Sequence, residues 1–400
     1  MKQFLDEHLY DIRQSHNGRW IDQKCTMDEL CFVADCVVNF LEEGGTEPFT
    51  SPDIWRADYS IHNVMELFCK PDPTDKTTID EYNKFFRQPL KMLSAAGVLS
   101  EKKVGIEIRF SVVNRDVLNY LSLNERNCMD FLCSYIEKTL KDSGLWDDFA
   151  SFFDEQTKER YQAVKKAFHD FCIKYTPIKN DKEPGRIFTK VLNPLAVKYK
   201  KKGSEGGRMS SKIVTLDKIK YNQPNSIRDK NKDKNISRQQ AKMAPTISSE
   251  DVSYKYQVTK AMNRLKKYND SYNSSRSEVT DRFSVGALAT HMHHIFPKSS
   301  FPSIADYVEN LIALTSAQHM QEAHPNGNTQ IIDKDFQYLC LICKTESIRK
   351  NLQDGFGSPL FYAFENFMTV LDTGFKSTFF VGLEPNDYNS VLSGIEMNYK

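Results

Sequence analysis

Four polar residues in the C-terminal half of the chain are of types that could perform hydrolytic chemistry. His293 and His294 end a predicted strand, Asn310 follows in a loop, and His319 comes nine residues after that asparagine. Imidazole accepts a proton near neutral pH and binds divalent metal ions. Hydrolysis of a phosphodiester needs such a base to activate water, and a cation to neutralise charge on the phosphate and the leaving oxygen. The types and spacing therefore fit a one-metal hydrolytic site.

These residues resemble the three elements of the HNH, or ββα-metal, endonuclease superfamily. The resemblance covers roughly 286–329 and consists of the histidine pair, then Glu309-Asn310-Leu311, then His319. Apolar strands flank these elements and a helix follows them. The segments 294–299 and 323–329 resemble HNH restriction endonucleases in particular. The resemblance implies a nuclease domain of two strands and a helix around one metal ion.

The family pattern implies a role for each residue. The first histidine of the pair binds the metal and the second activates water, so His293 would be a ligand and His294 the general base. Asn310 would fix the loop between the strands and thereby hold the base in position. His319 would be the second ligand. Two strong ligands leave room for water and phosphate oxygens, which favours one Mg²⁺ or Mn²⁺ per active site. Lys298 is a predicted DNA contact.

Two further histidines are ambiguous. His324 lies five residues after His319, about 140° away around an α-helix. The two would share a metal only if the helix broke near Pro325, so His324 is a candidate extra ligand or phosphate contact. His291 lies on the same strand face as His293 and could touch DNA, although we favour a structural role for it.

The nuclease module needs supporting elements around it. Leu311–Thr315 is predicted as its second strand, with Thr315 or Ser316 capping the helix that follows. A helix over about 250–267 leads into the module, and apolar periodicity over 359–371 predicts helical packing around it.

The first 114 residues predict a winged-helix-like domain. Apolar residues recur at helical spacing over 26–41 and 78–96, and a short helix is expected from Thr50. Thr26 and Glu29 are set as a capping box for the first of these helices. Alternation around a polar turn then predicts a β-hairpin over 97–113.

In a winged helix, the third helix would offer Arg87 and Gln88 to a major groove, and the hairpin would offer Lys102 and Lys103. Arginine can bond bidentately to guanine and glutamine to adenine, whereas lysine mainly contacts the backbone. DNA recognition is the prediction. The alternative is a helical interaction domain whose exposed face happens to carry cations.

The middle of the chain combines a helical spacer, 115–178, with a basic segment, 179–245. The basic segment holds 18 Lys and Arg against 6 Asp and Glu, a net charge of +12, although the whole chain carries only +1. Segregated positive charge is typical of a surface that contacts phosphates. The predicted contacts are Lys200, Lys201, Lys202 and Arg208. The alternative is a solvated linker. Residues 246–400 would form the nuclease domain.

Composition favours a cytoplasmic protein. The nine cysteines are spread irregularly, which does not predict a disulfide framework. Many HNH proteins bind a structural zinc with two CxxC pairs, but here there is one pair, Cys340 and Cys343. We interpret these as core thiols and predict no structural zinc. The chain begins without a signal peptide pattern and has no apolar run of about 18 residues, so no membrane partner is expected.

The combined interpretation is an α+β, mainly helical, sequence-specific endonuclease for double-stranded DNA, similar to a type II restriction enzyme and able to cut outside its site. A cognate DNA methyltransferase would be its partner in the same system, and double-strand cleavage would need a homodimer or sequential nicking. The alternatives are a mobile-element or modification-dependent HNH nuclease, and a winged-helix DNA-binding regulator with a structural metal module.

Overall fold

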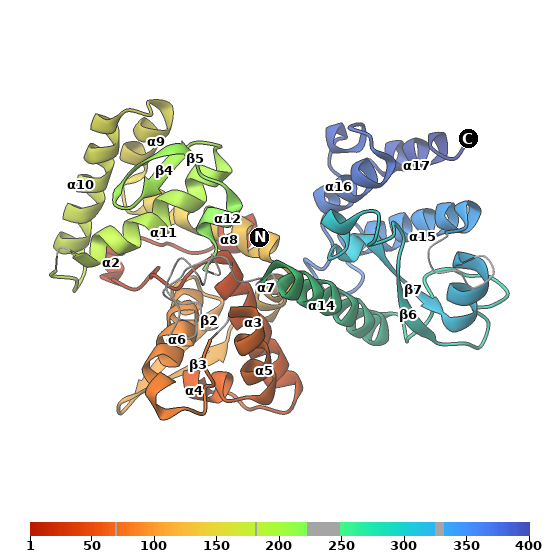
Figure 1. The fold of residues 1–400 in the computed structure, drawn as a ribbon, viewed down its shortest axis with the longest axis horizontal. Helices are drawn as coiled ribbons and strands as arrows, with labels where there is room; N and C mark the ends of the chain where they lie inside the picture. Colours follow the sequence, from red (N-terminus) through yellow and green to blue (C-terminus); the bar gives the residue numbers. More distant parts are fainter. Residues whose placement is uncertain (69, 181, 222–248, 325–331) are drawn as a thin grey trace, which may run out of the picture. The chain divides into compact units, whose positions relative to one another are not determined.

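Helix α3 (Met27–Glu42) is the central helix of the N-terminal part of the computed structural model (Figure 1). Its residues from Met27 to Val38 are buried because α6, α7 and α8 pack against it. The helix begins after Thr26 as predicted, but the predicted capping box is wrong. The buried Thr26 hydroxyl donates to the carboxyl groups of Asp28 and Glu29, at 2.6 and 3.1 Å, and accepts no main-chain N–H. The Thr26 hydroxyl is therefore used as a donor to carboxyl groups and does not cap the helix.

The structure describes residues 1–68, 70–180, 182–221, 249–324 and 332–400. The chain divides into two compact units, the first Met1–Ser249 and the second Glu250–Lys400. It is α+β and mainly helical, with small antiparallel sheets, which confirms the predicted fold class at this coarse level. None of the described helices is long and apolar enough to cross a membrane.

The first unit has the following elements. Its helices are α1 (Lys2–Asp6), α2 (Ile12–Ser15), α3, α4 (Ser51–Trp55), α5 (Asp58–Phe68), η1 (Lys76–Thr78), α6 (Ile79–Ala95), α7 (Arg115–Leu123), α8 (Glu125–Asp142), α9 (Trp146–Asp154), α10 (Lys158–Tyr175), α11 (Lys182–Lys198) and α12 (Leu216–Ile219). Its strands are β1 (Phe49–Thr50), β2 (Leu99–Val104), β3 (Glu107–Val112), β4 (Lys202–Glu205) and β5 (Arg208–Ile213).

The predicted hairpin is confirmed as β2 and β3, and β1 joins it in a sheet of order β1-β3-β2. Phe110 of β3 lies opposite Phe49 of β1, and both are buried. The short helix α4 begins as predicted, with a capping box formed by Thr50 and Asp53. The hairpin turn contains Ile106, which is 99% exposed.

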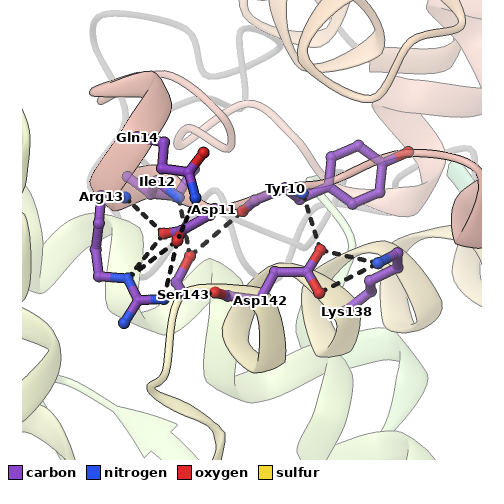
Figure 2. Close-up of polar contacts among 8 residues, drawn as sticks. All are labelled: Tyr10, Asp11, Ile12, Arg13, Gln14, Lys138, Asp142 and Ser143. Carbon is purple, nitrogen blue, oxygen red and sulfur yellow. Dashed lines mark hydrogen bonds and ion pairs between the residues drawn. The ribbon is translucent and has the colours of Figure 1, made fainter.

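The N-terminal segment is tied to the end of α8, far away in sequence (Figure 2). The main-chain N–H of Tyr10 donates to Asp142 at 2.8 Å, and that of Ile12 donates to the Ser143 hydroxyl at 3.0 Å. Arg13 donates to the main-chain oxygen of Asp142, and Lys138 also pairs with the Asp142 carboxylate. The helices of the predicted spacer therefore share one unit with the predicted winged helix. The predicted borders at 114 and 178 stay predictions.

The basic segment contains regular structure that the sequence interpretation missed. Strands β4 and β5 form an antiparallel hairpin. Its turn residues Gly206 and Gly207 have φ values of 57° and 77°. Two successive positive φ values belong to the tight hairpin turn that Gly-Gly favours, so this dipeptide was a usable signal. Residues 222–245 of the predicted basic segment lie outside the described residues.

The second unit has two strands and several helices. These are α14 (Ser249–Tyr272), β6 (Ala289–His294), η2 (Pro302–Ile304), η3 (Val308–Asn310), β7 (Leu311–Thr315), η4 (Gln318–Ala323), α15 (Lys334–Leu352), α16 (Phe364–Phe375), η6 (Phe380–Gly382) and α17 (Tyr388–Met397). Strands β6 and β7 pair antiparallel, as Figure 1 shows, while η4 packs against β7 and α15 packs against η4. The predicted strands and flanking helices of this region are thus present.

Candidate metal centre

The β6–β7 ribbon sets the directions of the histidines. A bulge at Thr290 shifts the register, so that Ala289 lies opposite Thr315 while His291 lies opposite Leu314. From there the pairing is regular, with His293 opposite Ile312 and His294 opposite Leu311. Alternate residues of a strand share a face, so His291 and His293 lie on one face and His294 on the other. Bulges of this kind re-aim side chains near functional sites.

The helix after β7 differs from the expected α-helix. Residues Gln318–Ala323 form a π-helix, in which each N–H bonds to the carbonyl five residues earlier. His324 follows this helix as its C-cap and has an extended backbone, with φ −125° and ψ 93°, so the 140° separation expected for an uninterrupted α-helix does not apply. Their rings contact each other with centroids 4.8 Å apart. The helix thus ends at Ala323, two residues before Pro325, and a helix end in this region was the condition under which the two histidines were expected to share a metal.

Three imidazoles converge at this point. Ligand atoms of His293, His319 and His324 all lie within 4.8 Å of one another. His293 is 5% exposed and His324 is 4% exposed. Their rings contact nearly at right angles, with His293 lying 5.3 Å from His319 and 5.1 Å from His324 between centroids. The structure therefore brings together both predicted ligands and the candidate extra one.

The electrostatics of the cluster fit a cation. Burial and, secondarily, the neighbouring histidines lower the pKa of His293 to about 3. Burial and the neighbours His291 and His324 lower the pKa of His319 to about 4. Both rings are therefore neutral at pH 7, which is the form that binds metal. Among the residues that the structure describes, the buried Nδ1 atom of His319 has no hydrogen-bond partner. A metal ion would satisfy this orphaned atom, so the residues present fit one.

The donor set bears on the type of ion. Neutral imidazole nitrogens suit first-row transition metals, whereas Mg²⁺ prefers oxygen ligands. Of the two ions expected from the sequence, Mn²⁺ belongs to the first-row transition series. A third imidazole therefore shifts the preference away from Mg²⁺.

Replacing His324 by alanine tests whether it is a third ligand. We expect Mn²⁺ or Co²⁺ to bind His324→Ala more than about 10-fold more weakly, because losing even an outer-shell partner costs roughly 10- to 100-fold. Isothermal titration of the metal-free protein measures this. The exposed His62 of the first unit provides a control in His62→Ala. If His324→Ala binds the metal as tightly as wild type, only His293 and His319 are protein ligands.

His294 points to the opposite face of the ribbon, towards the loop that follows β6. Its Nε2 lies 3.0 Å from the main-chain oxygen of Ala305. A carbonyl oxygen can only accept, so Nε2 carries the proton and Nδ1 keeps a free lone pair. Burial, first, and the positive charge of Lys298 lower the pKa of His294, and the Ala305 hydrogen bond opposes them. The side chain is thus a neutral imidazole of fixed tautomer, as a general base requires.

Asn310 fixes the loop that carries this carbonyl. The residue is fully buried, and its Oδ1 accepts from the N–H of Phe296 at 2.8 Å. Its Nδ2 donates to the main-chain oxygens of Phe296 and Ile304, at 3.0 and 3.2 Å. These hydrogen bonds fix the loop at Phe296, near its start, and at Ile304, the residue before Ala305. These bonds match the loop-fixing role that the resemblance implies.

Sequence reasoning missed two groups that hold the ribbon. Gln318 is fully buried, and its Oε1 accepts from the Ser277 hydroxyl and from the N–H of Thr315, at 2.6 and 3.0 Å. The Thr315 hydroxyl in turn accepts from the N–H of Gln318, which matches the predicted cap. The second group is the Glu278–Lys344 ion pair, joined at 2.7 Å. No spacing in the sequence links these two residues, since 65 others separate them.

The predicted DNA contacts lie in both units. Arg87 of α6 is exposed, as are Lys102 and Lys103 of β2. Gln88 is half-buried, and its Oε1 already accepts from the N–H of Lys24 at 2.9 Å. Part of its capacity to bond a base is therefore used within the protein.

The remaining predicted DNA contacts lie at the β4–β5 hairpin and in the loop that follows β6. Lys200 and Arg208 are exposed, whereas Lys201 and Lys202 are half-buried. They lie at the start of β4 and on β5. Lys298 is exposed in the second unit and close enough to His294 to affect its pKa.

The CxxC pair lies inside α15 and outside the histidine cluster. Cys340 is 1% exposed and Cys343 is half-buried. Burial raises the pKa of Cys340 well above its ordinary value and that of Cys343 to about 11. Neutral thiols in a helix interior are consistent with the packing role assigned to them.

Comparisons of the chain with protein-family models, with curated proteins and with solved structures found no match.

Proposed function

We propose that the protein is a metal-dependent endonuclease that hydrolyses double-stranded DNA. One observation carries this proposal: three imidazoles converge at His293, and the next residue of the strand, His294, is an imidazole whose tautomer leaves Nδ1 without a proton. Phosphodiester hydrolysis needs this combination of a cation site and a base. The resemblance of 286–329 to HNH nucleases agrees with it.

The residues would divide the chemistry between the two faces of β6. His293, His319 and His324 would hold a divalent ion, which when bound neutralises negative charge on the phosphate and the leaving 3′-oxygen. His294 would take a proton from the attacking water at Nδ1. The Nε2 hydrogen bond to Ala305 stabilises the imidazolium that results. Asn310 holds Ala305 in place and acts as a positioning residue.

The first unit is proposed to recognise DNA. Its helices and the β1-β3-β2 sheet follow the order of a winged helix, with α6 in the place of the recognition helix. Lys84, Arg87 and Lys91 recur at helical spacing on α6, where the first two are exposed and Lys91 is half-buried and pairs with Glu101. Such a stripe matches the negative charge of a groove edge. The hairpin of β4 and β5 would add phosphate contacts.

Separate recognition and cleavage units suggest a type II-like restriction enzyme that can cut outside its site. We propose that it acts in the cytoplasm beside a cognate methyltransferase, as a homodimer or by sequential nicking. Digestion of a sequenced plasmid with Mn²⁺ or Mg²⁺, followed by run-off mapping of both strands, tests this. Fixed cut positions are expected. DNA binding without cleavage under either ion would instead favour a winged-helix DNA-binding regulator with a structural metal module. A preference for methylated plasmid would favour the modification-dependent nuclease.

The second hairpin makes a separate prediction about salt. Log–log plots of DNA affinity against salt fall with a slope of about −0.9 for each phosphate contact. A variant with Lys200, Lys201 and Arg208 all replaced by alanine should therefore have a slope shallower by about 2 to 3 units. Fluorescence anisotropy at several salt concentrations measures it. Lys166→Ala is the control, because Lys166 pairs with Asp170 on α10. Equal slopes in the triple variant and wild type would remove this hairpin from the DNA contact surface.

A further inference from the structure

His291 lies next to the metal centre without belonging to the three-histidine set. Its ring stacks on that of His319, with centroids 4.7 Å apart and planes 21° apart. Its Nδ1 lies 3.0 Å from the Thr290 hydroxyl. Pairing is regular from His291 onwards, so His291 and His293 lie on the same face of β6. The strand thus places a flat ring against a candidate ligand.

His319 needs such support more than its two neighbours. It is half-buried, whereas His293 and His324 are buried. Metal-binding histidines usually donate their second ring nitrogen to an oxygen acceptor, which fixes the ring orientation. Within the described residues, His319 has no hydrogen bond to an oxygen acceptor at either ring nitrogen. Apart from the two other candidate ligands, His291 is the aromatic ring in contact with it.

We infer that His291 is a positioning residue, whose stacked ring holds His319 in the orientation that completes the metal site. The inference rests on the proposed metal centre. It assigns His291 a mechanical role through its ring face, and no nitrogen of His291 needs to bind the ion. A phenylalanine ring has a similar flat face but no nitrogen, so His291→Phe should retain this role.

Cobalt titration of the metal-free protein provides the test, because Co²⁺ bound to imidazoles absorbs visible light. A stacked aromatic pair contributes an amount that corresponds to about 2- to 10-fold in affinity. We therefore expect His291→Ala to bind Co²⁺ about 2- to 10-fold more weakly. His291→Phe should bind it as wild type does. Circular dichroism of each metal-free variant verifies folding.

Each result has a defined meaning. Wild-type affinity in His291→Ala would overturn the inference, since the stack would then not matter. Equal weakening in His291→Phe and His291→Ala would also overturn it, because the nitrogen and not the ring face would be needed. A folded wild-type protein that binds no Co²⁺ would refute the metal centre itself, and the role of His291 with it. Weaker Co²⁺ binding by His291→Ala, together with wild-type Co²⁺ binding by His291→Phe, supports the inference.

Discussion

His294→Ala should slow plasmid nicking by about 10²- to 10⁴-fold, the range that a general base contributes. The variant loses the only group proposed to take a proton from water. Because His294 lies on the face of β6 opposite His293, the three-histidine cluster is retained. Metal affinity should therefore stay close to that of wild type. Initial nicking rates under saturating Mn²⁺, combined with Co²⁺ titration, measure both quantities.

His294→Gln makes this prediction sharper. Its amide can still donate a hydrogen bond to the Ala305 oxygen but cannot accept a proton from water, so it should be as inactive as alanine. His62→Ala, at an exposed helix position of the first unit, should cut like wild type. Near wild-type cutting by His294→Gln would show that the imidazole acts only by holding the loop. Cutting by neither wild type nor variant, with DNA binding intact, would refute the nuclease.

The local part of the site was predictable from sequence because its determinants are close together. The strand pair, Asn310 and the positions of His293 and His319 follow from apolar segments and short spacings. The position of His324 could be predicted only conditionally. The 140° separation assumed an α-helix that continued through His324, whereas Gln318–Ala323 form a π-helix that ends before His324, whose backbone is extended. Apolar periodicity does not distinguish these helices, and the hydrogen bonds of Gln318 at the start of this one join it to Ser277 and Val279, which are distant in sequence.

In the first unit, too, sequence patterns predicted some elements and missed others. Amphipathic helices and the β2–β3 hairpin were predicted from periodicity, because half-buried elements repeat their apolar residues. The β4–β5 hairpin was missed because charge dominates its composition. Its Gly206-Gly207 turn, with positive φ at both residues, was the local signal for the hairpin. The capping box predicted at Thr26 is absent: Asp28 and Glu29 are buried and accept from the Thr26 hydroxyl, and the spacing of residue types does not show which residues the rest of the unit buries.

The buried Glu278–Lys344 ion pair joins residues distant in sequence and connects α15 to strand β7 of the β6–β7 ribbon. Lys344 of α15 is fully buried, and the Glu278 side chain is 6% exposed. Glu278 also exchanges two hydrogen bonds with Ala313 of β7, one through its N–H and one through Oε1, each 3.0 Å long. Lys344 donates further to the Tyr362 hydroxyl at 3.1 Å. The pair thus joins α15 to the strand that lies opposite His293.

Lys344→Met should lower the free energy of unfolding of the second unit by about 3–5 kcal/mol, because removing one partner leaves the other charge buried and unpaired. Lys344→Met combined with Glu278→Gln should recover most of this loss. The neutral amide still accepts from Ala313 but needs no cation. As a control, Lys350→Met at an exposed position should change the free energy of unfolding by no more than about 1 kcal/mol, since surface pairs such as Lys350–Glu346 contribute little to stability.

The distribution of tryptophan allows the two units to be followed separately. Trp20, Trp55 and Trp146, the three tryptophans of the chain, all lie in the first unit. In urea, Lys344→Met should shift a transition seen by circular dichroism while the tryptophan fluorescence transition stays in place. Metal-free conditions keep ion binding from masking the change. If both transitions shift together, the units unfold as one. If neither shifts, the buried pair does not support the ribbon, and the position of His293 must depend on the apolar contacts of β7 alone.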